Sequence, residues 1–215
     1  PIPSEIGRCQ NLLFLWLDNN TIVESIPTEL GSITSLEYLW VRNNRLTGTI
    51  PVELGNSPLR QVDFDANYFT GDIGAVIDSL PRSLEVLGVG GNQLRGTIPT
   101  SIGSFSNLID IDLGRNDMNG TIPSQFGNAT TLEALRLGEN NFVGTLPTSI
   151  ASLPNLSLLH VYGNNLTGSL DEFCTVWNDP LGLKIFAANS CGGSDIECPC
   201  CNVCCSIDIF ECRVI

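Results

Sequence analysis

The sequence is poor in the residues that several classes of function require. It has one histidine among 215 residues, and 10 basic residues against 23 acidic ones, which gives a net charge of −13. Nucleic acids and anionic membranes are bound through lysine and arginine, so the charge opposes both as partners. The acidic excess suits solubility, basic partners or cations. Nor is there an apolar run of the ~20 residues that a membrane helix needs.

Catalytic motifs are also lacking. His160 is the one histidine of the sequence, and no nucleophile-elbow motif is present. A serine or cysteine catalytic site therefore has little support. Gly88-Val89-Gly90-Gly91 alternates like a strand and does not match a dinucleotide fingerprint. We therefore expect no enzyme activity and no cofactor, and we interpret His160 first as an exposed surface residue.

What the sequence does have is a repeat. Seven asparagines follow one another at intervals of 24, 23, 25, 24, 24 and 24 residues. Each is the ninth position (slot nine) of a unit whose first, fourth and sixth slots are apolar. The asparagines are Asn20, Asn44, Asn67, Asn92, Asn116, Asn140 and Asn164. A period in the twenties with this internal pattern indicates a leucine-rich repeat, a stack of coils.

Each slot has a physical interpretation. Slots one, four and six are expected to point into a core, while the side chains between them face outward from a short strand. Stacked strands then form one parallel sheet. The slot-nine asparagine is expected to turn inward and satisfy backbone groups freed by the bend, because buried polar groups need partners. The coils begin at Leu12, Leu36, Leu59, Leu84, Leu108, Leu132 and Leu156, after a half coil at 1–11.

The stretch Leu-x-Gly-x-Ile-Pro-x-x-Leu-Gly makes the resemblance specific: residues 1–173 look like the plant-type extracellular leucine-rich repeat of receptor ectodomains and inhibitors. The resemblance implies an α/β horseshoe-type solenoid with a parallel sheet on the concave face. It also implies short second strands and 3₁₀ turns on the convex side, with little true α-helix. Glu24 replaces the glycine of slot thirteen, and Ile73-Gly74 replaces Ile-Pro, so both places are irregular.

Residues 174–215 are expected to form a cysteine-rich C-terminal cap. Leu183, Phe186, Ala188 and Cys191 still fit slots one, four, six and nine, which predicts a degenerate eighth strand at 183–191. The tail resembles the cysteine-rich ends of leucine-rich-repeat proteins of diatoms. Solenoid ends require caps, so a cap is the role we expect.

Cysteines and sequons indicate the compartment. We favour disulfides, hence an oxidising compartment, with a thiolate metal cluster as the alternative. The expected disulfide cysteines are Cys174, Cys191, Cys198, Cys200, Cys201, Cys204, Cys205 and Cys212, with connectivity left open. Cys9 falls in an apolar slot and is expected to be a buried free thiol, or to pair outside this sequence.

Five N-x-[ST] sequons favour a secreted glycoprotein. Their acceptors occupy slots expected to be exposed: Asn19, Asn119, Asn128, Asn155 and Asn165. The chain opens inside a half coil without an initiator methionine, so we expect a processed or partial product.

The outward strand slots carry the strongest functional signal. Exposed aromatic residues and arginine are typical anchors of interfaces. Phe14, Trp16, Tyr38 and Trp40 are expected to stack one coil apart, or else to cover one another or an N-terminal segment. We predict a ligand-binding face made of these four residues with Arg42, Asp63, Asp65, Asp110, Asp112, Arg136, His160 and Tyr162.

Two further patterns have plainer interpretations. The pairs Asp63/Asp65 and Asp110/Asp112 favour a carboxylate face over an EF-hand, with a weak surface cation site as the alternative, and we assign no metal. A column of hydroxyl residues at slot fourteen, such as Thr97 and Thr121, resembles an ice-binding row, but we favour a role in the second strand.

The sequence therefore predicts an extracellular recognition module that binds a protein, peptide or glycan on its concave face. The alternative is a self-assembling or adhesive glycoprotein of a cell wall or matrix. It would associate through an N-terminal edge at Leu12 to Leu17, which no coil in this sequence covers.

Overall fold

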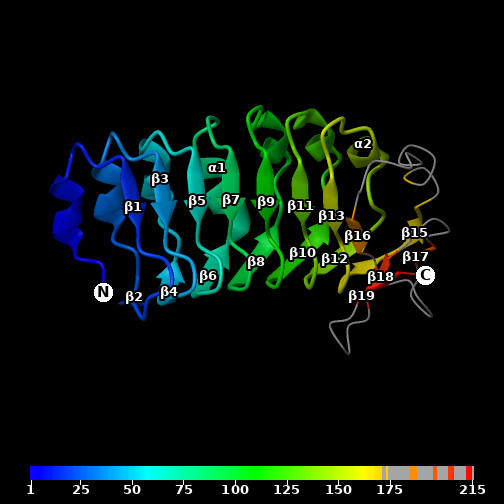
Figure 1. Ribbon diagram of the computed structural model, residues 1–215, viewed down its shortest axis with the longest axis horizontal. Helices are drawn as coiled ribbons and strands as arrows, with labels where there is room; N and C mark the ends of the chain where they lie inside the picture. Colours follow the sequence, from blue (N-terminus) through cyan, green and yellow to red (C-terminus); the bar gives the residue numbers. More distant parts are fainter. Residues whose placement is uncertain (171–172, 174–184, 188–195, 198–202, 206–211, 215) are drawn as a thin grey trace.

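The computed structural model describes residues 1–170, 173, 185–187, 196–197, 203–205 and 212–214. The chain winds into coils stacked along one long axis, with β1 near one end and β13 and β16 near the other (Figure 1). Each coil contributes a strand to one sheet, a strand to a second sheet, and a helical turn that leads into the next coil.

The first sheet is parallel, has eight strands and forms the concave face. Equivalent slots lie side by side, so that Leu15 pairs with Leu39 and Trp16 with Trp40. Its middle residues are core leucines or their equivalents, and the residues flanking them point outward. The strands are β1 (Phe14–Trp16), β3 (Tyr38–Trp40), β5 (Gln61–Asp63), β7 (Val86–Gly88), β9 (Asp110–Asp112), β11 (Ala134–Arg136), β13 (Leu158–His160) and β16 (Ile185–Ala187).

The second sheet follows the asparagine turn and has seven parallel strands. Its inward residue is slot eleven, as shown by fully buried Leu46, Phe69 and Met118. Slots ten, twelve and fourteen are exposed. The strands are β2 (Val23–Glu24), β4 (Arg45–Thr49), β6 (Tyr68–Asp72), β8 (Gln93–Thr97), β10 (Asp117–Thr121), β12 (Asn141–Gly144) and β14 (Asn165–Leu166).

Short helical turns complete each coil. All but one begin directly after a proline whose fixed φ suits the entry to a helix, for example Pro99 at −77°. Coil three has Gly74 in place of that proline and forms a longer α-helix instead, with the Asp72 side chain accepting from the Ala75 amide at 3.1 Å. The turns are η1 (Ser4–Arg8), η2 (Thr28–Ser32), η3 (Val52–Asn56), α1 (Ile73–Ser79), η4 (Thr100–Ser104), η5 (Ser124–Asn128) and α2 (Thr148–Ala151).

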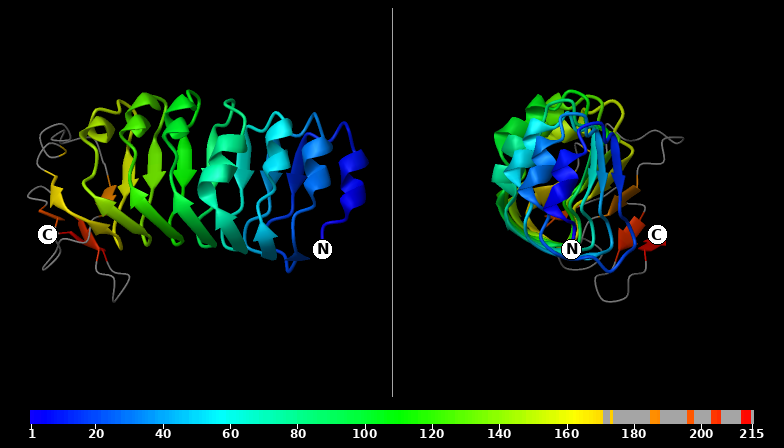
Figure 2. Two further views of the ribbon diagram at one scale, coloured as in Figure 1. Left: turned by 180° about the vertical axis from the view of Figure 1, so that it is seen from behind. Right: turned by 90° about the vertical axis from the view of Figure 1, so that its left-hand side faces the viewer.

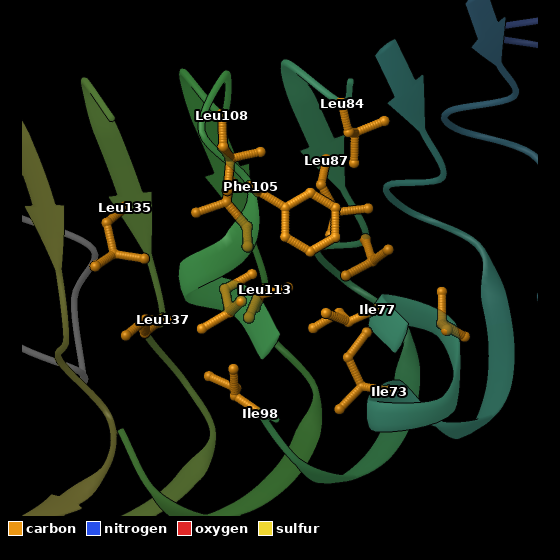
Figure 3. Packing of buried hydrophobic residues seen from close by; sticks show 14 of the residues in the cluster. Ile73, Ile77, Leu84, Leu87, Ile98, Phe105, Leu108, Leu113, Leu135 and Leu137 are labelled. Carbon is orange, nitrogen blue, oxygen red and sulfur yellow. The ribbon is translucent and has the colours of Figure 1, made fainter. Parts of the chain in front are cut away.

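The core runs unbroken through the stack, as Figure 3 shows around Phe105, with Leu84 and Leu108 beside it and Ile73 and Ile77 of α1 below. Five phenylalanines are essentially inaccessible to solvent, among them Phe64 and Phe126. Because successive coils share this core, each coil is stabilised mainly by its two neighbours.

An asparagine ladder joins the coils on one side of the core. Asn116 is representative: its Nδ2 donates to the carbonyl of Val89 in the preceding coil and to Leu113 in its own coil, and its Oδ1 accepts from the Leu94 amide at 2.9 Å. The same bonds recur from Asn44 to Asn164. The inward asparagine expected from the sequence is confirmed from Asn44 to Asn164, whereas Asn20 is exposed.

The residue before each ladder asparagine has a left-handed backbone conformation. The backbone φ at slot eight lies between 52° and 66° in all seven coils, whether the residue is asparagine, alanine, arginine, glutamate or glycine. These residues are Asn19, Asn43, Ala66, Gly91, Arg115, Glu139 and Gly163. The bend therefore follows from the coil geometry, because five of these residues carry a side chain that disfavours it.

The first coil is less enclosed than the others. Cys9, expected to be buried, is an exposed free thiol. Its equivalents Ile33 and Ala129 are fully buried. The difference has a physical cause, because those residues are covered by the strand half of their own coil, which the half coil 1–11 does not contain.

Towards the C-terminus, β16 pairs with β13 in the first sheet, within the range where an eighth strand was expected. Two further pairs are β15 (Gly168–Ser169) with β17 (Ile196–Glu197), and β18 (Val203–Cys205) with β19 (Cys212–Val214). The predicted disulfides lie outside the residues whose side chains are described. No helix in the described ranges is long and apolar enough to cross a membrane.

Candidate functional site

The N-terminal third of the concave face carries an aromatic patch, made of Phe14, Trp16, Tyr38 and Trp40. The rings of Phe14 and Tyr38 stack with centroids 4.5 Å apart and planes 14° apart. Trp16 and Trp40 meet edge to face, also at 4.5 Å. Phe14 remains 56% and Trp16 67% exposed, so mutual packing leaves much apolar surface open to solvent.

A pocket of about 200 Å³ lies within this patch, lined by its four rings, Leu15 and Gln61. An aliphatic or aromatic side chain fits a lining of this kind. The pocket therefore offers an apolar anchoring point, with the amide of Gln61 as its polar neighbour.

Polar groups border the patch on the C-terminal side. The indole nitrogen of Trp16 donates to Asp18 Oδ2 at 2.9 Å, and Asp18 Oδ1 accepts from the Arg42 amide at 2.8 Å. Arg42 also lies 4.0 Å from Asp63. Asp18, Arg42 and Asp63 line a wider hollow of about 580 Å³ next to the aromatic pocket. The orientation of Trp16 is thus fixed by a bond to its own coil.

The centre of the face is an acidic cluster, Asp63, Asp65 and Asp112, beside Gly88 and Gly90 of coil four. Asp65 Oδ1 accepts from the Gly90 amide at 2.6 Å. A Cβ placed on Gly90 would lie 2.8 Å from Asp112 Oδ1, and one on Gly88 would lie 3.0 Å from both Asp63 and Asp65. The carboxylates therefore occupy the space where coil four has no side chains.

Burial and crowding change the ionisation of this cluster. The pKa of Asp65 is raised to about 7, chiefly by burial and then by the nearby charges of Asp63 and Asp112. Burial likewise raises the pKa of Asp63 and of Asp112. At neutral pH Asp65 is consequently partly protonated, and the cluster would gain from a cationic neighbour.

The C-terminal third has mixed charge. Arg136 is 2.5 Å from Asp110, and Arg115 is 2.9 Å from Glu139. His160, expected to be exposed, is half-buried beside Tyr162, and burial with the charge of Arg136 lowers its pKa. A pocket of about 210 Å³ is lined by Arg115, Arg136, His160 and Tyr162 together with Asp65 and Asp112.

All twelve residues predicted for the ligand face lie along the first sheet or directly after its strands, and all of them except Asp110 line one of the three pockets. Sequence reasoning missed Arg115 and Glu139, which lie in slot eight rather than in an outward strand slot. The sequence could have indicated them, because slot eight holds asparagine, glycine or alanine in the other coils. An arginine and a glutamate of opposite charge in slot eight of two successive coils depart from that pattern.

The other predicted sites are distributed differently. The five sequon acceptors are all exposed and none lies on the strands of the first sheet. Within the described part of the chain, no group of three or more His, Cys, Asp or Glu side chains is arranged to hold a metal ion. The slot-fourteen threonines pack against the glycine turn of the next coil: a Cβ on Gly120 would lie 2.8 Å from Thr97 Cγ2.

Comparison with known proteins agrees with this architecture. A sequence profile described as Leucine Rich Repeat matches residues 35–57, 83–105 and 131–153, which are three alternate coils. The fold is a leucine-rich-repeat solenoid. None of the curated protein sequences compared with this chain matches it.

Several similar solved structures are plant proteins. The ectodomain of the Arabidopsis receptor kinase HAESA, in complex with an N-terminally extended IDA peptide hormone, has a TM-score of 0.73 at 33% identity, over 79% of this chain and 28% of that one. The ectodomain of GASSHO1/SCHENGEN3 from Arabidopsis thaliana, in complex with CASPARIAN STRIP INTEGRITY FACTOR 2, has a TM-score of 0.71 at 28% identity. The match covers 87% of this chain and 25% of that one. A plant ice-binding protein has a TM-score of 0.74 at 26% identity, over 87% of this chain and 61% of that one. The leucine-rich-repeat chain thus spans about a quarter of the two ectodomains.

Proposed function

We propose that this leucine-rich-repeat solenoid is a non-enzymatic recognition module that binds an extended peptide or protein segment along its concave face. An apolar side chain of the ligand would occupy the aromatic pocket. The rest would run across the acidic cluster towards Arg136 and Tyr162. A glycan is the other ligand class that an aromatic surface of this kind suits.

The observation that carries the proposal is the aromatic patch. Two ring pairs, each at 4.5 Å, leave Phe14 and Trp16 more than half exposed around an apolar pocket. Exposed apolar patches of this size mark interaction sites on soluble proteins, and tryptophan, tyrosine and arginine dominate binding energies. The complex of HAESA with a peptide hormone and that of GASSHO1/SCHENGEN3 with CASPARIAN STRIP INTEGRITY FACTOR 2 support the same class of function.

Charge narrows the ligand chemistry. Asp18 and Asp63 outnumber Arg42 in the wider hollow, and the whole chain has a net charge of −13. A ligand with basic side chains C-terminal or N-terminal to its apolar anchor would lower the electrostatic cost of the crowded carboxylates. We therefore expect selection of peptides that combine an aromatic or aliphatic residue with lysine or arginine.

Displayed random peptides and a glycan array provide the test. Binders selected on the intact chain should lose at least tenfold in affinity with Trp16→Ala or Trp40→Ala, equivalent to about 1.4 kcal/mol. Tyr68→Ala is the matched control, because Tyr68 is a 51% exposed aromatic residue on the second sheet. Equal affinity of the wild type and both tryptophan variants would contradict the assignment of the face.

We further propose that the protein acts outside the cell and is glycosylated at some of the exposed sequons. The plant receptor ectodomains to which it is similar support the location. Mass spectrometry of native material, before and after enzymatic removal of N-glycans, reports occupancy at each acceptor. Unmodified peptides at all five acceptors would argue against this location.

A structural role in a cell wall or matrix is the second candidate, favoured by the open surface of the first coil. It predicts association that grows with concentration, seen as filaments or a series of oligomers. Electron microscopy of unreduced material, with light scattering across a dilution series, separates it from a monodisperse recognition module.

A further inference from the structure

Two residues, Trp40 and Gln61, separate the aromatic pocket from the wider hollow, because both of them line both spaces. They belong to β3 and β5, the strands of coils two and three, so each has a coil on either side of it. The strands of the first sheet lie on the opposite side of the coils from the helical turns (Figure 2, right). The junction of the two spaces is therefore formed by Trp40 and Gln61 on a face that the helical turns do not cover.

The indole N–H of Trp40 is open at this junction. Trp16, its equivalent in coil one, donates to the Asp18 carboxylate two residues later, at 2.9 Å. The residue two positions after Trp40 is Arg42, whose guanidinium has donors and no acceptor. Among the described residues, no acceptor takes the Trp40 N–H. The change from aspartate to arginine between the two coils thus leaves one ring nitrogen without a partner in the chain.

Gln61 supplies a second open group. Its backbone amide donates to the Glu37 carbonyl at 3.1 Å, but its side chain makes no hydrogen bond within the part of the chain that the structure describes. It is partly buried, between Tyr38 on one neighbouring strand and Val86 on the other. Water is therefore the partner that remains for this carboxamide and for the Trp40 N–H.

The two open groups are complementary to a hydroxyl. An indole N–H only donates, whereas the carboxamide oxygen of Gln61 accepts. A hydroxyl does both, so it can accept from Trp40 and donate to Gln61 at the same time. The pocket beside them is lined mainly by rings, which favours an aromatic group. Tyrosine is the amino acid whose side chain has a ring and a hydroxyl at its far end.

Other anchors match the junction less well. A phenylalanine ring would displace water from both open groups and replace none of their hydrogen bonds, which costs affinity. A tryptophan N–H could donate to Gln61 but could not accept from Trp40. A ring that ends in an acidic group would bring its charge towards Asp18 and Asp63 in the wider hollow.

We propose that the aromatic pocket selects a tyrosine side chain of the ligand, with its ring among the four aromatic residues and its hydroxyl at the junction. Gln61 is then a specificity-determining residue, because its oxygen distinguishes tyrosine from phenylalanine. This inference rests on the proposed peptide-binding function. It narrows the anchor of the ligand from any aliphatic or aromatic side chain to tyrosine.

Peptides selected on the full chain from a displayed random library are the probes. They should share a tyrosine, and its replacement by phenylalanine should lower affinity about tenfold, since the hydroxyl makes two hydrogen bonds. In Gln61→Leu, which removes the amide, this difference should fall to about threefold, because Trp40 still donates. Gln61→Glu keeps an acceptor and should retain the preference for tyrosine. Fluorescence polarisation measures each affinity.

Gln93→Leu is the matched control, because Gln93 is an exposed glutamine on the second sheet. It should leave the tenfold difference intact. Binders that need Trp40 but share another anchor, or bind equally well with phenylalanine, would overturn the inference and leave the proposed function standing. An undiminished tenfold difference in Gln61→Leu would do the same. If no selected peptide depends on Trp40, the proposed function and this inference fail together.

Discussion

The position of a side chain in this solenoid depends on the neighbouring coil that it faces as much as on its own coil. Asp63, Asp65 and Asp112 come from coils three and five, yet they converge because Gly88 and Gly90 leave coil four without side chains on the concave face. The sequence indicated an outward row of carboxylates and glycines. It could not indicate that the carboxylates would fold over the glycines, since that depends on χ angles set by Gly90 and Gly114 amides.

Asp65 should make stability depend on pH. Its pKa of about 7 in the folded chain lies above the ordinary value of 3.8, so the folded chain retains a proton that the unfolded chain loses. Stability should therefore fall as pH rises from about 4 to 7 and then level off. Asp65→Asn keeps an acceptor for the Gly90 amide and removes the charge. We expect it to stabilise the chain at pH 8 by about 1–2 kcal/mol, with little change at pH 4.5.

Urea denaturation at pH 4.5, 6 and 8 checks this expectation. Asp117→Asn is the control, because Asp117 is an exposed carboxylate on the second sheet, away from the cluster. A pH profile of Asp65→Asn parallel to that of the wild type would show that the proton is not held at this site.

At the scale of elements, the turn between slots twelve and fourteen decides how closely the strands of the second sheet stack. Six of the seven coils place glycine at slot thirteen with positive φ, between 78° and 106°. Glu24 takes the same conformation at 72°. The sequence predicted an irregular turn at Glu24. In the structure the turn has the same conformation as in the other coils, so Glu24 has a strained left-handed backbone.

Two substitutions should have opposite effects. Glu24→Gly should stabilise the chain by about 0.5–1 kcal/mol, because relief of left-handed strain exceeds the added entropy of the unfolded glycine. Gly120→Ala should cost about 1–2 kcal/mol or more, since φ is +79° and the new Cβ would meet Thr97. Thermal unfolding measures both changes.

Val23→Gly serves as the comparison for Glu24→Gly, because it lies in the same strand but outside the positive-φ positions. It should destabilise the chain. If both glycine substitutions shift stability in the same direction, backbone strain at Glu24 is not the cause.

The repeat pattern predicted the core slots, the strands of the first sheet and the inward asparagine, while the second strands and the 3₁₀ turns were implied by the resemblance to plant-type repeats. α1 is the exception: replacing the proline by Gly74 signalled irregularity, but its helix depends on the cap that Asp72 supplies. Cys9 was misplaced for a related reason. Slot position predicts burial only where the rest of the coil is present to cover the slot.

At the scale of the whole molecule, charge opposes compactness. A net charge of −13 on 215 residues creates self-repulsion that salt screens, with a Debye length of about 30 Å at 0.01 M falling to about 8 Å at 0.15 M. We expect Tm to rise by roughly 2–4 °C between these ionic strengths, equivalent to about 1 kcal/mol. Scanning calorimetry in sodium chloride and in potassium chloride should give the same rise. A fall in Tm would mean that ion pairs such as Arg115–Glu139 outweigh the repulsion.

The repeated junction has a consequence for how such a gene can change. Each coil from the second to the seventh takes the same carbonyl and the same amide from the coil before it. A crossover that joins equivalent slots of two of these coils therefore preserves each bond across the new seam. Unequal recombination can lengthen or shorten this molecule in whole coils without an intermediate that fails to fold, so the reach of its binding face evolves separately from its architecture.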